Sequence, residues 1–142
     1  MIKLITWFRP YSGYLLTAWI IIILTLSSIP SLKPLRIETP KSSIRLDYLI
    51  HFCEYGSLAF LAYLSFAGSN FRINLKKFLL ITAGLILFSL LDEFHQKLIP
   101  GRTFNVKDIY SNIAGIVAGL VFCVVVFRIL ERKQDFFTTE SH

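Results

Sequence analysis

Cysteine is scarce in this sequence, and several familiar catalytic patterns are missing from it. The 142 residues contain two cysteines, Cys53 and Cys123, which both fall inside apolar runs where a thiol behaves as a small hydrophobic side chain. A disulfide framework is therefore not expected. The sequence also has no nucleophile elbow, no phosphate-binding glycine loop, no dense His/Cys cluster and no internal repeat. Nothing in it points directly to a familiar hydrolase or nucleotide-binding enzyme.

Charge is also sparse, and it is confined to short segments. Hydrophobic residues make up 54% of the chain, and the mean hydropathy is +0.60, which is too apolar for an ordinary soluble domain. The length fits one domain, residues 1–142. The net charge of +6 would suggest nucleic acid on a soluble chain, but here the basic residues separate apolar runs. We expect a lipid bilayer as partner, with anionic head groups, and no nucleic acid.

Four apolar runs are each long enough to cross a hydrocarbon core, which takes about 20 helical residues. They predict an all-α fold, an integral membrane bundle of four transmembrane helices at residues 11–29, 48–67, 78–99 and 109–127. Aromatic residues crowd the start of the first run, as they do at a head-group boundary. A cleaved signal peptide is the competing interpretation of that run. A polar tail is expected after residue 127.

The number of spans places both termini on one side of the membrane. With the termini in the cytoplasm, the inner segments hold 8 Lys/Arg and the outer segments hold 7. If Arg45 and Arg102 are set aside as pocket residues, the count becomes 8 against 5. We therefore expect a multi-pass protein of the cell membrane with cytoplasmic termini.

Unusual polar residues gather where the second helix starts, the third ends and the fourth starts, and these three points must lie at one membrane face. Asp47, His51 and Tyr55 follow at i, i+4 and i+8, so they share one stripe of the second helix, with Glu54 beside it. Glu54 lies ~9 Å from that face, at 1.5 Å rise per residue. We expect this stripe to face the other polar residues.

The third and fourth helices carry matching polar pairs. Asp92 and Gln96 are i and i+4, and Asp108 and Asn112 have the same spacing. Asp92 lies about 10 Å from the shared face, which is close to the depth of Glu54. Glu93 is adjacent to Asp92. Ionisable groups at this depth are costly unless they have a partner, a cavity or a proton, so we expect them to be functional.

Each of these groups also has a structural interpretation. Asp47 could only cap the second helix, and Asp108 could only complete a capping box begun by Asn105. His51 could be a solvated residue of the interface. The buried acids could form structural ion pairs with Arg102, Arg45 or Lys97. Gly115 and Gly119 on the fourth helix, a small-xxx-small face, are better explained by close helix packing than by chemistry.

The pattern resembles that of VanZ-like membrane proteins, over roughly residues 47 to 120. The matching residues are Asp47, His51-Phe52, Glu54-Tyr55-Gly56, Leu91-Asp92-Glu93, Gln96, Pro100-Gly101-Arg102, Asp108, Asn112, Gly115 and Gly119. Tyr48 and Thr103 stand where Lys and Ser are common in relatives. The resemblance implies a four-helix protein of the cell envelope and a role in susceptibility to glycopeptides such as teicoplanin. It implies no accepted reaction.

Two classes of function follow. In the first, the protein binds or processes an anionic lipid or cell-wall precursor. Arg102 and Arg45 would contact phosphate, and the other substrate-binding candidates are Gln96, Asn112, Asp47, Glu54 and Tyr55. An enzymatic version would use Asp92, Glu93 and Asp108 as acid, base or metal ligands, with a divalent cation as candidate cofactor and His51 as proton shuttle. In the second, the protein is a non-catalytic scaffold or, less favoured, an ion or proton carrier that uses Glu54 and Asp92.

Overall fold

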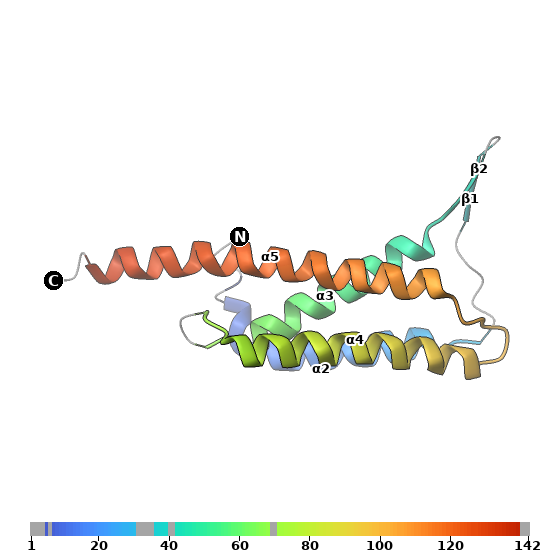
Figure 1. Ribbon diagram of the computed structural model, residues 1–142, viewed down its shortest axis with the longest axis horizontal. Coiled ribbons are helices and arrows are strands. Elements are labelled where there is room, and N and C mark those ends of the chain that lie inside the picture. The colour runs from blue at the N-terminus through green and yellow to red at the C-terminus, as the bar shows by residue number, and fades with distance from the viewer. Residues whose placement is uncertain (1–4, 6, 31–35, 40–41, 69–70, 140–142) are drawn as a thin grey trace.

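The computed structural model describes residues 5, 7–30, 36–39, 42–68 and 71–139, with side chains except in the two strands and beyond residue 132. A 3-10 turn, η1 (Arg9–Tyr11), leads into α2 (Ser12–Ser27). The other helices are α3 (Asp47–Phe66), α4 (Leu75–Leu98) and α5 (Val106–Thr139). The helices run along the long axis of the molecule, α2 and α4 in one direction and α3 and α5 in the other (Figure 1). The predicted all-α bundle of four helices is confirmed.

A short hairpin lies between the first two membrane helices. Strands β1 (Arg36–Thr39) and β2 (Ser42–Arg45) pair in antiparallel fashion, with Arg36 opposite Arg45. The hairpin projects away from the bundle at the end where α3 and α5 begin (Figure 1). The sequence predicts only a loop here. Arg45, predicted to bind substrate, lies in β2, and its side chain is outside the described part of the structure.

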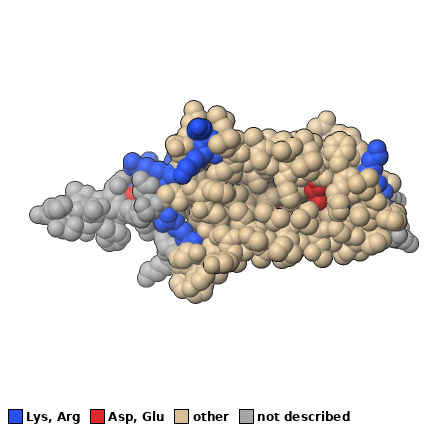
Figure 2. All heavy atoms as spheres, turned by 90° about the horizontal axis from the view of Figure 1, so that it is seen from below, with Lys and Arg blue, Asp and Glu red and all other residues tan. Residues whose placement is uncertain are grey.

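The four helices are long and apolar enough to cross a membrane, over Arg9–Ser27, Asp47–Phe66, Leu75–Leu98 and Val106–Arg132. Large apolar side chains cover their outer surface; for example, Leu80 is 62% exposed and Val121 is 56% exposed. Figure 2 shows Lys and Arg toward the two ends of the molecule and, between them, a long surface of other residues with a small patch of Asp or Glu near the right end. Side chains of this kind need a lipid environment. The chain is a multi-pass membrane protein.

The closest helix contact joins α3 and α5 through glycine. A Cβ atom added to Gly115 would lie 3.0 Å from the backbone nitrogen of Gly56 and even closer to the carbonyl oxygen of Phe52. One added to Gly119 would lie 3.0 Å from the Cβ atom of Ala59. The two backbones can approach this closely only because no side chain separates them. The predicted small-residue face of the last helix is therefore a packing surface.

The last helix is longer than predicted. The apolar run stops at Phe127, but α5 continues to Thr139, so the segment expected to be a polar tail is helical. Charged residues end a membrane span because they are unfavourable in the hydrocarbon core, but they do not end the helix. Residues 128–139 contain neither Gly nor Pro, and Leu, Glu, Arg, Lys and Gln among them are good helix formers.

The end of the bundle opposite the hairpin is basic, and we call it the basic end. Its described cationic residues are Arg9, Arg72, Lys76, Lys77, Arg128 and Arg132. Arg9 donates hydrogen bonds to the carbonyl oxygens of Ala67 and Gly68, and its guanidinium lies 4.8 Å from the centre of the Phe71 ring. Arg72 forms an ion pair with Glu131 at 2.8 Å. These contacts join the start of α2 and the end of α3, and fix α5 to the connection before α4.

Candidate functional site

At the other end of the bundle, polar side chains from α3, α4 and α5 meet in the interior, and we call this group the buried polar cluster. Each member has at most 9% of its surface exposed, and Tyr55, Glu93 and Asn112 have none. The members are His51, Tyr55, Asp92, Glu93, Gln96, Asp108 and Asn112. The sequence predicts all seven as candidate site residues. The structure brings them together between the helices.

Asp92 links α4 to α3 and, through Gln96, to α2. The Tyr55 hydroxyl donates a 3.0 Å hydrogen bond to Oδ2 of Asp92. The amide nitrogen of Gln96 donates to the same oxygen at 3.2 Å and to the hydroxyl of Ser27, at the end of α2, at 3.3 Å. Neutral donors therefore stabilise one oxygen of this carboxyl group. The other oxygen, Oδ1, is buried and has no hydrogen bond to the described residues.

Glu93 takes part in the cap of α5. Asn105 precedes this helix, and its side-chain oxygen accepts a 3.1 Å hydrogen bond from the backbone N–H of Lys107. A capping box would return a bond from Asp108 to the backbone N–H of Asn105, but Oε1 of Glu93 accepts that bond instead, at 2.7 Å. The predicted capping box is therefore wrong, because the acid that accepts the backbone N–H of Asn105 is Glu93 and not Asp108. A buried acid of one membrane helix stabilises the start of the next.

His51 faces the first turns of α5. Its Nδ1 lies 3.1 Å from Oδ1 of Asn112, and its Nε2 lies 3.9 Å from Oδ2 of Asp108, too far for a hydrogen bond. Asp108 also accepts a 3.0 Å hydrogen bond from the side-chain amide of Asn105. His51 is therefore a buried residue of the cluster, and the alternative of a solvated interfacial histidine is wrong.

Arg102 lies in the connection between α4 and α5, partly buried above the cluster. Its guanidinium donates a hydrogen bond to Oε1 of Gln96, and its backbone N–H donates to the carbonyl oxygen of Ile99 at 3.1 Å. Among the described residues it forms no ion pair, and neither do Asp92 and Glu93. The ion pairs considered for these acids are therefore not formed with Arg102 or Lys97. Most of the five N–H donors of the guanidinium stay available.

Three further candidates lie at the margin of the cluster. Glu54 is half-buried on α3 and interacts electrostatically with Asp92 and Arg102, while its carbonyl oxygen accepts a 3.0 Å hydrogen bond from the indole of Trp19. Asp47 is the first residue of α3; Leu46 occupies the N-cap position and makes no side-chain cap bond, so Asp47 lies one residue inside the helix. A carboxylate in the first turn of a helix still interacts favourably with the positive end of the helix dipole. Lys97 is exposed.

Several buried polar atoms of this region lack a hydrogen bond to the described residues. They lie on α4 and α5, and they are Ser89 Oγ, Asp92 Oδ1, Glu93 Oε2 and Asn112 Nδ2. Ser89 and Ser27 are not predictable from the sequence, because a single serine in an apolar helix has no distinguishing pattern. Within the described residues no group of three His, Cys, Asp or Glu side chains is arranged to hold a metal ion.

A family model described as VanZ/LLP1 matches residues 8–128, which include all four membrane spans up to Arg128 and the whole buried polar cluster. No curated protein and no solved structure matches the chain.

Proposed function

The chain belongs to the VanZ/LLP1 family, and from this membership and the cluster geometry we propose that it binds the phosphate of an anionic lipid or lipid-linked cell-wall precursor. The contact is made by Arg102, at the membrane face where the buried polar cluster lies. Binding there would alter the supply or exposure of the precursor, and so the susceptibility of the cell to teicoplanin.

The observation that carries this proposal is that Arg102 is held in place by Gln96 and yet forms no ion pair with an acidic side chain among the described residues. The acids beneath it use neutral donors: Asp92 accepts from Tyr55 and Gln96, and Glu93 accepts from a backbone N–H. A guanidinium fork fits two phosphate oxygens, and in a region of low dielectric such a contact is stronger than in water. The cation is therefore positioned for a ligand that comes from outside the protein.

The cluster also fixes the connection that carries Arg102. Gln96 holds the guanidinium, Glu93 holds the backbone of Asn105, and Gly101 between them adopts a positive φ of 78° that favours glycine. Preorganisation of this kind lowers the entropy lost on binding. The buried acids would then serve to position Arg102, and they need not take part in a reaction.

The proposal places the cluster at the outer face of the cell membrane and both termini in the cytoplasm. Over the whole sequence, the segments at the basic end hold 8 Lys or Arg and the segments at the other end hold 7, or 5 when Arg45 and Arg102 are set aside as pocket residues. This imbalance favours a cytoplasmic basic end. Arg102 would then meet lipids of the outer leaflet, where teicoplanin acts on wall precursors.

The test is retention of lipid phosphate by the purified protein. We expect wild type to retain phosphatidylglycerol in preference to phosphatidylcholine with the same chains, and Arg102→Ala to retain one phosphatidylglycerol fewer than wild type. Arg102→Lys keeps the charge but not the planar fork, and it should lose this phosphatidylglycerol nearly as completely as Arg102→Ala. Lys97→Ala is the matched control, because Lys97 is an exposed cation at the same end. Equal retention by wild type, Arg102→Lys and Arg102→Ala would exclude phosphate recognition by Arg102.

A second candidate function is a non-catalytic scaffold. The close α3–α5 contact through Gly56, Gly115 and Gly119 favours it, since a polar cluster above such a contact also serves to fix helix register. In that case Arg102→Ala should leave both lipid retention and teicoplanin susceptibility unchanged. Cluster variants should then change only the stability of the protein.

A further inference from the structure

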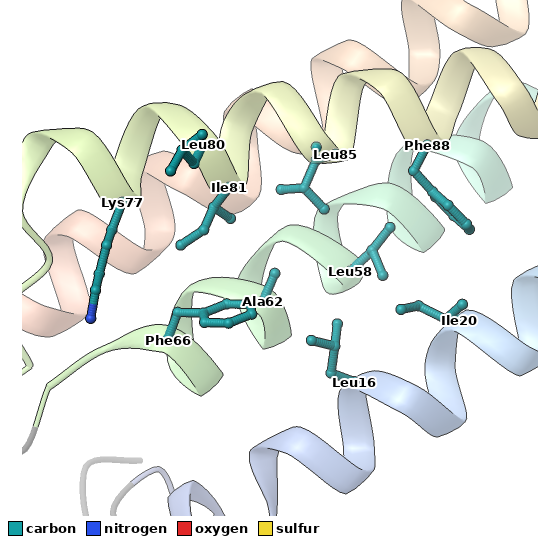
Figure 3. Close-up of a pocket in the computed structure, with 11 residues that line it drawn as sticks. Leu16, Ile20, Leu58, Ala62, Phe66, Lys77, Leu80, Ile81, Leu85 and Phe88 are labelled. Atoms are coloured by element: carbon teal, nitrogen blue, oxygen red, sulfur yellow. The ribbon is translucent and has the colours of Figure 1, made fainter.

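An apolar groove opens on the side of the bundle between α2, α3 and α4, at a distance from Arg102. Its volume is about 590 Å³. Leu16 and Ile20 form one wall, Leu85 and Phe88 form the other, and Leu58 and Ala62 of α3 form the floor. Figure 3 shows Lys77 and Phe66 at one end of the groove and Ile20 and Phe88 at the other. We call this the apolar groove.

The length of the groove matches one leaflet of a bilayer. Lys77 and Phe88 are eleven residues apart on α4, which is about 16 Å along the helix axis at 1.5 Å per residue. This is roughly half of a hydrocarbon core about 30 Å thick. The groove therefore runs from the basic end to the middle of the membrane.

The inner end of the groove stops where the buried polar cluster begins. The rings of Phe88 and Tyr55 have centroids 6.2 Å apart, and the hydroxyl of Tyr55 points into the cluster toward Asp92. Phe88 therefore separates the apolar groove from the cluster. A molecule in the groove would enter from the leaflet at the basic end.

Lys77 gives the groove one charged end. It is exposed, lies beside the other cations of the basic end, and forms no ion pair with the described acidic residues. The groove has apolar walls about as long as one leaflet is thick, and the ammonium group of Lys77 lies at one end. This arrangement matches one lipid molecule, whose acyl chain would lie in the groove and whose phosphate would lie beside Lys77. Anionic head groups are attracted to such clusters of Lys and Arg.

We propose that the apolar groove holds one acyl chain of an anionic phospholipid from the leaflet at the basic end, with its phosphate bound by Lys77. This site is separate from Arg102 and does not depend on the function proposed above. It uses a different leaflet and different residues.

Gly84 allows the groove to be filled without disturbing the bundle. It lines the groove, and a Cβ atom added to it would have no other atom within 4 Å. Gly84→Phe should therefore occupy the space of the chain, whereas Ala83→Phe adds the same ring at an exposed position next to it and outside the groove. The full-length protein in detergent is titrated with phosphatidylglycerol, and bound lipid is counted by native mass spectrometry. Gly84→Phe should bind one phosphatidylglycerol fewer than wild type, and Ala83→Phe should bind the same number as wild type.

Lys77→Gln and Lys76→Gln test the head-group contact. Lys77→Gln should weaken phosphatidylglycerol binding about fivefold, the effect of one cation near a phosphate, and should weaken the binding of phosphatidylcholine with the same chains less, because the choline cation offsets the phosphate charge. Lys76→Gln, an exposed neighbour outside the groove, should change neither. Equal lipid binding by Gly84→Phe and Ala83→Phe would overturn the proposal, as would a protein dimer that only Gly84→Phe abolishes. If circular dichroism shows that Gly84→Phe has not folded, Gly84→Leu decides the question in the same way.

Discussion

Substitution of Gly115 by Ala should weaken the α3–α5 contact severely, although it adds only one methyl group. The new Cβ atom would overlap the carbonyl oxygen of Phe52 and lie 3.0 Å from the nitrogen of Gly56. Both are backbone atoms of α3, so no side chain can rotate away and the helices must separate. Overpacking of this kind costs about 1–3 kcal/mol, or roughly 5- to 150-fold in the folding equilibrium.

Gly84→Ala is the control, because the same methyl group there meets no atom within 4 Å. It should leave stability unchanged or raise it by up to about 1 kcal/mol, the helix propensity gained on replacing Gly by Ala. The assay is loss of helical circular dichroism as sodium dodecyl sulfate is added to the protein in mild detergent, with the midpoint compared among wild type and both variants. If Gly115→Ala and Gly84→Ala have the same midpoint, the close approach of α3 and α5 at Gly115 does not stabilise the bundle.

Three other predictions concern the polar end. Glu93→Ala leaves the backbone N–H of Asn105 without its acceptor and should lower stability by about 1–3 kcal/mol, whereas Glu93→Gln keeps an acceptor and should cost less; equal midpoints in the same denaturation assay would contradict the capping role. Tyr55→Phe removes the bond to Asp92 and should also destabilise the bundle, by about 1 kcal/mol or more, while the exposed Tyr14→Phe should not. Cysteine at the exposed Thr103 should react with an impermeant thiol reagent on intact cells, and reaction only after the inner face is opened would reverse the proposed topology.

The sequence predicts the membrane helices well because their length is set by the bilayer. The predicted spans begin within about three residues of the helices observed, since apolar runs of this length have few other structures available. The extension of α5 was missed because the apolar run shows only where charged residues begin. It does not show where the helical hydrogen bonding ends. The hairpin of Arg36–Arg45 was missed because its pairing depends on a turn that the polar composition does not specify.

The membership of the buried polar cluster was also predictable, but its pairings were not. Helical spacing places Asp92 with Gln96 and His51 with Tyr55, and the matching depths bring the helices together. Spacing along one helix cannot show that Glu93 accepts the N–H of Asn105, since that bond depends on how the connection folds back over α4. The apolar groove was not predictable either, because its lining residues have the same apolar character as the lipid-facing residues next to them.

The bond between Glu93 and Asn105 also bears on how the protein enters the membrane during synthesis. It joins α4 to the start of α5, and the contacts of Gln96 with Arg102 and of Asn105 with Asp108 lie within the same hairpin. Polar groups that pair inside a helical hairpin do not have to wait for earlier helices before they leave the insertion machinery. The α4–α5 pair can therefore enter the lipid as one unit. Tyr55 and His51 then add their contacts with Asp92 and Asn112 when α3 docks against this pair.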